Sequence, residues 1–290
     1  MSVLVAGTVA LDSIKTPTDS RDRVLGGSAT YASLAVAHSV NGSGTPVFLC
    51  GVVGDDFPDA HLQLFRDRAI DTANLDIVPD GKTFFWAGEY FGDLNTRETL
   101  ETQINVLDQF DPELSAGARS ASIVVLANMG PEDQLKVLAQ VEAPKFVLAD
   151  TMDLWINIAR EKLGEVLTKL DLLVLNDSEA KMMMDTSNLI TAGHRLLELG
   201  PKHVAIKKGE HGAILFGPDR YFTTGAFPLH EVADPTGAGD TFLGGVAGSL
   251  AAVGGEIAFE DIVRAIVQGT VLASFTCETF STEALIALTP

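Results

Sequence analysis

The sequence predicts an α/β fold in which a doubly wound, mainly parallel sheet is flanked by helices and carries a small β lid. The chain has 290 residues, of which 46% are hydrophobic and 20% charged, so it can bury one large core. Short apolar runs alternate with segments of helical periodicity, as in layered α/β domains. No solenoid repeat and no linker rich in Pro, Gly or Ser divides the chain. We therefore expect a single domain over residues 1–290.

Six apolar runs are the predicted strands of the main sheet. Continuous runs of roughly four to six apolar residues are typical of parallel strands covered on both faces. Helical patterns separate them, for example at residues 131–140 and 188–199. In chain order the runs are SVLVAG at 2–7, VFLCGVVG at 47–54, SIVVLAN at 122–128, KFVLAD at 145–150, LLVLN at 172–176 and HVAIKKG at 203–209.

One stretch interrupts this alternation early in the chain. Residues 81–95, GKTFFWAGEYFGDLN, are aromatic and have the composition of a strand. They predict a small β flap that stands off the main sheet. Exposed strands such as 83–91 often need covering, so we interpret this flap as the joint of a homodimer.

Charge and composition exclude several classes of partner. The formal net charge of −19 argues against a surface that follows nucleic-acid phosphates or binds anionic membranes. The start of the chain lacks a basic leader with a long apolar core, and no apolar run reaches the roughly 18 residues of a membrane span. Cys50 and Cys277 lie far apart, without metal-ligand spacing. A reduced, cytoplasmic setting is the prediction.

Polar residues recur where the predicted strands end. Ligands of open α/β sheets collect at the carboxyl ends of the strands, where loops lead into helices. Because Asp, Asn and Gly are also common in turns and caps, each position taken alone has a structural interpretation too. These positions are Asp12, 51–56, Asn128, Asp150, Asn176 and 207–209.

The most specific stretch is DPTGAGD at residues 234–240. Gly237, Ala238 and Gly239 lack bulk, so their amides can turn toward one point at the start of a helix that begins near Asp240. Such a point binds an anion, and a carboxylate at its rim is well placed to accept a proton from an attacking hydroxyl. The alternative is that Asp240 is an N-cap and the glycines form a tight turn.

Five motifs in order along the chain resemble those of the ribokinase, or PfkB, family of carbohydrate kinases. They are GGSATYASLAVA at 26–37, GVVGDD at 51–56, NDSE at 176–179, KKGEHGA at 207–213 and DPTGAGD at 234–240. The resemblance covers nearly the whole chain. It implies a ribokinase-like fold with a lid formed roughly by residues 12–24 and 81–106.

The resemblance implies an ATP-dependent phosphotransferase. Asp240 would be the base that deprotonates the acceptor hydroxyl, and the amides of Gly237, Ala238 and Gly239 would be the anion hole. The chain has no G-x-x-x-x-G-K-[ST], so amides, a metal ion and Lys207 must stabilise the phosphates. Residues 270–280 would line the adenine site. The implied nucleotide-binding residues are Asn176, Lys207, Gly209, Gly212 and Thr236.

Asn176 and Glu179 are three residues apart, which places both on one face of a helical turn. The family assigns this pair to the region of Mg²⁺ and phosphate, acting largely through water, and Mg²⁺ keeps much of its hydration shell. An acidic protein needs this cation, since the nucleotide phosphates would otherwise meet like charge. The alternative is that Asn176 or Ser178 caps the helix.

On the acceptor side, Asp12 matches the family aspartate that grips sugar hydroxyls. Gly26 and Gly27 match the pair that lets the backbone approach the substrate, and Asn128 falls where a further substrate contact is common. Carboxylates and backbone amides form hydrogen bonds with hydroxyl groups, which favours a small sugar or polyol as the substrate. Tyr31 either stacks on the substrate or packs in the core with Leu34.

Two departures from the family pattern bear on the substrate. Tyr31 stands where ribokinases commonly have Asn, and residues 149–155, ADTMDLW, lack the Asp-x-Asn-x-Arg pattern of some acidic-sugar kinases. Both argue against ribose and ketodeoxygluconate as acceptors. The favoured function is phosphorylation of a hydroxyl on a small sugar or polyol. The alternatives are an adenosine-like nucleoside kinase and a catalytically silent sugar- or nucleotide-binding regulator on the same fold.

Overall fold

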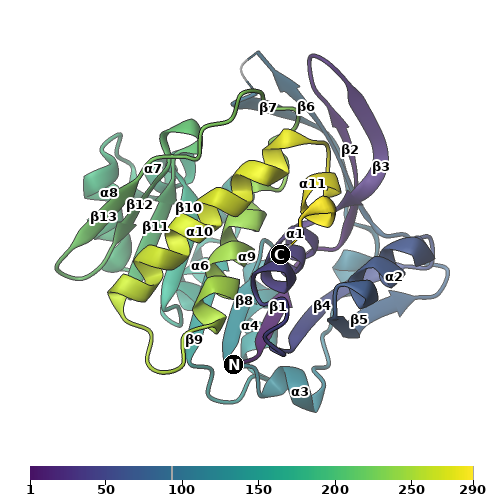
Figure 1. The fold of residues 1–290 in the computed structure, drawn as a ribbon, viewed down its shortest axis with the longest axis horizontal. Coiled ribbons are helices and arrows are strands. Elements are labelled where there is room, and N and C mark those ends of the chain that lie inside the picture. The colour runs from purple at the N-terminus through teal and green to yellow at the C-terminus, as the bar shows by residue number, and fades with distance from the viewer. Residues whose placement is uncertain (93, 290) are drawn as a thin grey trace.

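A nine-stranded sheet forms the centre of the protein in a computed structural model that describes residues 1–92 and 94–289 (Figure 1). Asp93, inside the predicted lid, and Pro290 lie outside the described residues. The strand order is β13-β12-β11-β10-β9-β8-β1-β4-β5. The seven strands from β11 through β10, β9, β8, β1 and β4 to β5 pair in parallel. The pairs β11–β12 and β12–β13 are antiparallel. The predicted doubly wound, mainly parallel sheet is confirmed.

All six apolar runs predicted as strands lie in this sheet. They are β1 (Val3–Ala6), β4 (Val47–Gly54), β8 (Ile123–Leu126), β9 (Phe146–Asp150), β10 (Leu172–Asn176) and β11 (His203–Lys207).

The prediction missed the strands at the two edges of the sheet. The outer strands β5 and β13 are partly exposed, and their sequences carry no continuous apolar run. Strand β12 does carry one, because its four residues AILF are all buried, and the prediction overlooked it. These strands are β5 (Ile70–Val78), β12 (Ala213–Phe216) and β13 (Tyr221–Thr224).

The sheet separates two hydrophobic cores, as strand β1 illustrates. Val3 and Val5 pack into the core on one face, and Leu4 and Ala6 into the core on the other, because successive side chains of a strand point to opposite faces. Helices cover both faces (Figure 1). The first core holds side chains from α1 (Ser28–Ser39), α2 (Asp59–Asp67), α9 (Ala238–Ala251), α10 (Phe259–Glu278) and α11 (Glu283–Ala287). The second holds side chains from α3 (Ala116–Arg119), α4 (Pro131–Leu138), α5 (Asp153–Ile158), α6 (Arg160–Leu167), α7 (Asp177–Met184) and α8 (Leu189–Leu197).

Helices α4 and α8 confirm the helical patterns predicted at 131–140 and 188–199. Two short 3₁₀ segments complete the described elements, η1 (Asn105–Gln109) and η2 (Gly209–His211). None of the helices in residues 1–92 and 94–289 is long and apolar enough to cross a membrane.

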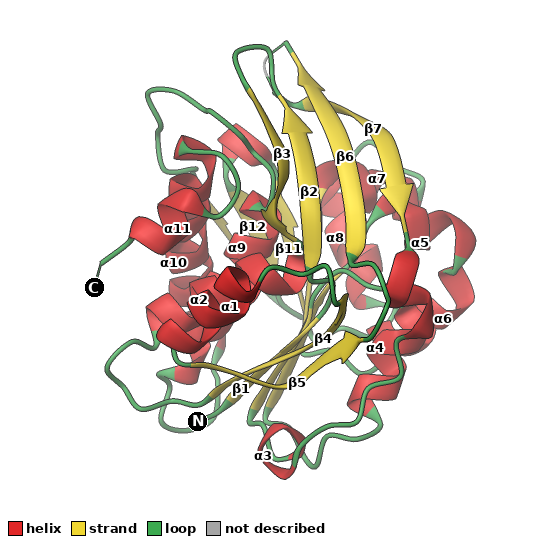
Figure 2. Ribbon diagram, turned by 90° about the vertical axis from the view of Figure 1, so that its right-hand side faces the viewer, coloured by secondary structure: helices red, strands yellow, loops and turns green. Residues whose placement is uncertain are grey.

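A second sheet of four strands stands off the main one (Figure 2). Its order is β3-β2-β6-β7, with β2 and β6 parallel and both outer pairs antiparallel. The strands are β2 (Ala10–Lys15), β3 (Ser20–Gly26), β6 (Phe84–Phe91) and β7 (Thr96–Gln103). The predicted lid segments, 12–24 and 81–106, hold most of this sheet; that it opens and closes stays a prediction.

Candidate active site

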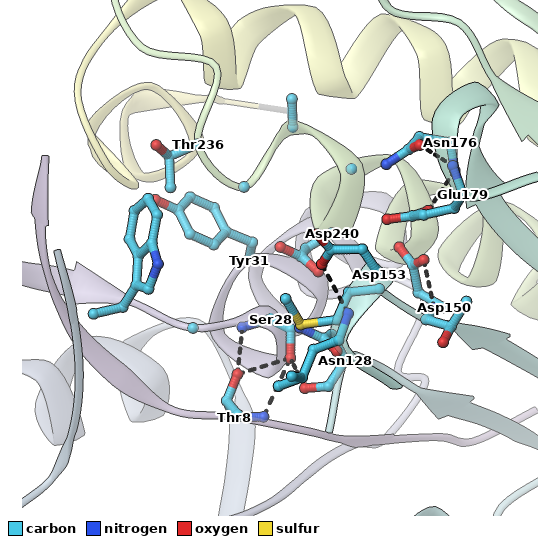
Figure 3. Close-up of a pocket in the computed structure, with 18 of the residues that line it drawn as sticks. Thr8, Ser28, Tyr31, Asn128, Asp150, Asp153, Asn176, Glu179, Thr236 and Asp240 are labelled. Carbon is cyan, nitrogen blue, oxygen red and sulfur yellow. Dashed lines mark hydrogen bonds between the residues drawn. The ribbon is translucent and has the colours of Figure 1, made fainter. Parts of the chain in front are cut away.

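A cavity of about 1350 Å³ lies between the carboxyl ends of the central strands and the second sheet. Strands β9, β10 and β11 are neighbours and end in Asp150, Asn176 and Lys207, so parallel pairing brings these three side chains to one edge. Figure 3 shows Tyr31, Asn128, Asp150, Glu179 and Asp240 around this space. A single small-molecule pocket usually measures roughly 300–1,000 Å³. The cavity therefore has room for two small molecules side by side.

Helix α9 opens into the cavity with its N-terminal amides. Gly237 is its N-cap, with φ of 76°, and no side chain caps it. The Ala238 amide donates to Pro235 O at 3.2 Å and closes a turn. The amides of Gly237 and Gly239 have no hydrogen-bond partner in the described part of the chain. Two of the three predicted anion-hole amides are thus open, and the turn occupies the third.

Asp240 is the third residue of α9, because the helix begins at Ala238. The interpretation of Asp240 as the N-cap is therefore wrong: only glycine adopts the left-handed conformation at the cap without strain, and Gly237 occupies it. Burial in the cavity wall, and next the Asp150 charge, raise the pKa of Asp240 to about 7, while Lys207 and Arg97 oppose the rise. A carboxylate that titrates near neutrality suits proton transfer.

Lys207 is a buried cation shared among carboxylates. Its Nζ donates to Asp150 Oδ2 at 2.8 Å, and only 17% and 7% of the two side chains are exposed. Burial alone would lower the pKa of Lys207, but the charges of Asp150 and Glu179 outweigh it and raise the pKa. A Cβ on Gly239 would lie 2.8 Å from Nζ, so this ammonium lies against the open amides. The predicted phosphate-binding lysine is already paired in this structure.

Asn176 and Glu179 form a capping box at the start of α7 (Figure 3). Asn176 Oδ1 accepts from the Glu179 amide at 2.8 Å, and Glu179 Oε2 accepts from the Asn176 amide at 2.7 Å. The capping alternative is therefore confirmed for Asn176. Glu179 is also buried, and burial, together with the Asp150 charge, raises its pKa to about 7.

The donor set fits Mg²⁺ only as a hydrated ion. The described residues contain no group of three or more His, Cys, Asp or Glu side chains that could hold a metal. Glu179 and Asp150 nevertheless face the cavity as neighbouring carboxylates. Mg²⁺ binds in this manner, through one or two carboxylates with the rest of its shell from water and phosphate.

Asp12 lies on β2 and is buried in the cavity wall. Burial raises its pKa to about 7, the Gly27 amide opposes the rise, and the charge of Asp240 adds to it. A Cβ on Gly26 would overlap the Asp12 carboxylate, so Gly26 makes room for it across the β2–β3 pair. Gly27 has φ of 93° and lines the cavity, whereas Gly26 does not. The structure thus brings Asp12 and Gly27 to the site and leaves Gly26 behind Asp12.

Tyr31 packs in the core, as one of its two interpretations predicted, and its stacking on a substrate stays a prediction. Its side chain is 1% exposed within the main core, and its ring fills the space beside Gly237. It also lines the cavity, and its buried hydroxyl has no hydrogen-bond partner among the described residues. Burial, and next the Asp12 charge, hold its pKa well above the ordinary value, so the hydroxyl is a neutral donor. An unpaired buried donor is costly unless a ligand uses it.

Asn128 also lines the cavity, at the end of β8. Its Oδ1 accepts from Trp155 Nε1 at 2.9 Å, and its Nδ2 contacts Met152 Sδ at 3.1 Å. Ser28 Oγ donates to its backbone carbonyl at 2.9 Å. The amide orientation is therefore fixed before any ligand binds.

The remaining predicted nucleotide-binding residues lie at the same cavity. Thr236 Oγ1 donates to Tyr90 OH at 3.1 Å, which ties the DPTGAGD loop to the second sheet. Gly209 begins η2 and Gly212 follows it, and Gly212 has φ of 80° with no room for a side chain beside the Thr224 backbone. From the predicted adenine segment, α10 contributes Thr270, Ala273, Ser274 and Cys277 to the lining.

Several lining residues escaped the sequence-based prediction. Trp86 and Tyr90 belong to the aromatic flap, whose composition was the available signal. Arg97 on β7 and Thr151 after β9 carried no local signal. The Thr151 hydroxyl is buried without a hydrogen-bond partner among the described residues.

Comparison with known proteins identifies the family of the chain. A family model described as pfkB family carbohydrate kinase matches residues 21–287. A cytidine kinase of Thermococcus kodakarensis is 27% identical over 249 residues, which are 84% of this chain and 87% of that protein.

Two solved structures share the fold. The ribokinase of Giardia lamblia has a TM-score of 0.81 and 18% identity, covering 98% of this chain and 95% of that one. A putative ribokinase II of E. coli, solved with ATP and Mg²⁺, has a TM-score of 0.75 and 18% identity, covering 96% and 92%. The predicted ribokinase-like fold is confirmed.

Proposed function

The chain belongs to the pfkB family of carbohydrate kinases, and on that basis we propose that it transfers the γ-phosphoryl group of ATP to a hydroxyl of a small sugar or polyol. One observation carries the proposal. The Asp240 carboxylate, whose pKa is raised to about 7, lies in the first turn of α9 beside the open amides of Gly237 and Gly239. A base and an anion site in one cavity are the two requirements of phosphoryl transfer to a hydroxyl.

In the proposed reaction Asp240 accepts the proton of the acceptor hydroxyl. The hydroxyl oxygen forms a bond to the γ-phosphorus, the bond from that phosphorus to the β–γ bridging oxygen breaks, and ADP leaves with the electron pair. The open amides of Gly237 and Gly239 stabilise the charge of the group in transfer, helped by the dipole of α9. Asp12, which also lines the cavity, holds other hydroxyls of the acceptor.

Mg²⁺ bound with the nucleotide would neutralise charge on its phosphate oxygens. Glu179 would hold the hydrated ion through water, and Asn176 fixes the Glu179 carboxylate through the capping box. Lys207 shields the Asp150 charge beside this region.

A nucleoside is the second candidate acceptor, because the cavity has aromatic walls. Phe84, Trp86 and Tyr90 come from the second sheet and Trp155 from α5, and flat apolar rings suit a nucleobase better than a sugar alone. The similarity to a cytidine kinase supports the same candidate. The unpaired Tyr31 hydroxyl can donate to a ring oxygen of either acceptor.

A screen for ADP release tests the proposal. Purified protein with ATP and Mg²⁺ is offered pentoses, hexoses, ketoses, inositols and nucleosides including cytidine. We expect one class to stimulate ADP release in the parent and not in Asp240→Asn. Stimulation by nucleosides alone would replace the sugar assignment, and ATP binding without turnover on any acceptor would favour the silent regulator.

A homodimer through the second sheet and a cytoplasmic location stay predictions. The outer strand β7 supports the dimer, since nearly all of its residues are exposed and Leu100 is 56% exposed. Sedimentation of the parent and of Leu100→Lys tests it: a dimer that the substitution converts to monomer is the expected result.

A further inference from the structure

Arg97 differs from the other cations that line the cavity. Three of them are paired with carboxylates: Lys136 Nζ lies 3.0 Å from Asp133, Lys162 Nζ 2.9 Å from Glu165, and Lys207 Nζ 2.8 Å from Asp150. Arg97 forms no ion pair with any residue in 1–92 or 94–289.

The cavity otherwise carries an excess of negative charge. Its acidic lining residues outnumber the cations and are Asp12, Asp108, Glu132, Asp133, Asp150, Asp153, Glu179, Glu210 and Asp240. A phosphoryl group in transfer would meet these carboxylates with few free cations nearby, and the repulsion is strong where water is excluded. A guanidinium that lines the cavity and forms no ion pair with the described residues is the complement such a group requires.

The second sheet holds Arg97 in position. Arg97 is opposite Tyr90 in the β6–β7 register, and its guanidinium lies over the Trp86 ring, 5.4 Å from the centroid. Its positive charge is one of the influences that lower the pKa of Asp240, after that of Lys207, so the charge acts at the catalytic end of the cavity.

Two hydrogen bonds near this arginine connect the second sheet and its β6–β7 turn to the rest of the protein. Tyr90 OH accepts from Thr236 Oγ1 at 3.1 Å, and Asn95 Nδ2 donates to Glu210 Oε2 at 3.3 Å. Thr236 precedes the open amides of α9, and Glu210 lies in η2 beside Gly209. The second sheet is thereby tied to the rest of the protein at the strand residue opposite Arg97 and just before the strand that carries Arg97.

We propose that Arg97 is a catalytic residue, which binds the phosphoryl group during its transfer and links that transfer to the seating of the second sheet. The inference rests on the proposed kinase function. In the step described above, Arg97 donates hydrogen bonds to the non-bridging oxygens of the γ-phosphoryl group, opposite the Gly237 and Gly239 amides. The bonds formed and broken are unchanged, and the proton still goes to Asp240.

The first test is kinetic and uses the acceptor that is active with the parent. Arg97→Gln is expected to lower kcat by roughly 10²–10³-fold with little change in the KM for ATP, because the contact strengthens in the transition state. Arg97→Lys keeps the positive charge but lacks the planar set of N–H donors of a guanidinium, so it should retain part of the rate. Lys15→Gln is the matched control: it removes an exposed cation of the same sheet, paired with Glu89 outside the cavity, and should leave kcat at the parental value.

The second test measures binding. ADP, Mg²⁺ and aluminium fluoride imitate the phosphoryl group in transfer, and calorimetry with the acceptor present compares parent and variants. Arg97→Gln should weaken the aluminium fluoride complex at least tenfold and leave the affinity for ADP alone unchanged. Equal loss of both affinities would show a general structural role and overturn the inference, as would parental kcat in Arg97→Gln. A parent that phosphorylates no acceptor would instead overturn the proposed kinase function itself.

Discussion

Helices α7 and α9 both begin at the cavity, yet their first turns are built differently. Asn176 and Glu179 close the start of α7 with two reciprocal hydrogen bonds, at 2.8 and 2.7 Å. At α9 the cap is a glycine, no side chain caps the turn, and the Gly237 and Gly239 amides have no partner in the described residues. The first turn of a helix always leaves amides that need acceptors.

The difference separates a structural terminus from a binding one. At α7 the Glu179 carboxylate accepts from the Asn176 amide and the Asn176 side chain accepts from the Glu179 amide, so Glu179 is held in place at the cavity wall. At α9 the carboxylate in the same helical position, Asp240, leaves the neighbouring amides open. An anion from outside can bind there, and Asp240 can act as a base beside it.

The largest effect is expected at the open terminus, for Asp240→Asn. Asparagine keeps the size of the side chain but cannot accept the proton, so kcat should fall by roughly 10²–10⁴-fold. Nucleotide affinity should hold or rise slightly, because one negative charge near the phosphate site is lost. Steady-state rates, ATP affinity and Tm of the one variant check this, and a kcat within about threefold of the parent would remove Asp240 as the base.

Alanine at the two glycines of α9 should give the next largest effect and separate their roles. Gly237→Ala places a Cβ against the Tyr31 ring at positive φ, so we expect a loss of roughly 1–3 kcal/mol in unfolding free energy along with activity. At Gly239 the Cβ meets only the end of the Lys207 chain, 2.8 Å away, which can shift. Gly239→Ala should fold with nearly parental stability and lose about tenfold in kcat. Urea unfolding and kinetics of both variants distinguish the two roles.

Activity and stability should respond to pH in opposite directions. The pKa of Asp240 is raised to about 7, chiefly by burial, so kcat/KM should rise as the pH increases through about 7 and the base ionises. Burial also raises the pKa of Glu179 and Asp12 to about 7. A raised folded-state pKa gives stability that is full below the ordinary carboxyl pKa and is lost as the pH rises through the folded value. Unfolding free energy should therefore fall between about pH 4 and about pH 7. A flat profile would contradict the burial of these carboxylates.

A moderate effect is expected when the closed terminus loses its carboxylate charge. Glu179→Gln keeps a hydrogen-bond acceptor for the Asn176 amide but weakens the field that holds a hydrated cation. The Mg²⁺ concentration for half-maximal rate should rise by about tenfold, with a smaller change in kcat at saturating metal. Superimposable Mg²⁺ titrations of parent and variant would place Glu179 outside the metal region.

The smallest effect is expected for the cap itself. Asn176→Ala removes the acceptor for the Glu179 amide and should cost about 1 kcal/mol of unfolding free energy, while the freed Glu179 raises the Mg²⁺ requirement modestly. Asn188 caps α8 outside the cavity, accepting from the amides of Ile190 and Thr191. Asn188→Ala is thus the matched control: a similar loss of stability is expected, without a change in the Mg²⁺ titration. If both variants alter the titration equally, the capping box has no special link to the metal.

The sequence by itself determined six of the nine strands of the main sheet and most residues of the candidate site. Continuous apolar runs mark strands buried on both faces, and the residues that end them are fixed at the ligand-binding edge by parallel pairing alone. The glycines of DPTGAGD likewise predict a turn that brings backbone amides together. These features depend on local composition, which can be read without the fold.

Only the tertiary structure decided how charge is distributed in the cavity. Lys207 pairs with Asp150, 57 residues earlier, and Thr236 bonds Tyr90, 146 residues earlier. No local pattern records such contacts, because they depend on how the second sheet and the central strands meet in space. For the same reason the sequence did not predict that Arg97 lines the cavity. It also did not predict which amides of α9 are open, because the turn that uses the Ala238 amide and leaves those of Gly237 and Gly239 open follows from backbone geometry. The residue types permit that geometry but do not dictate it.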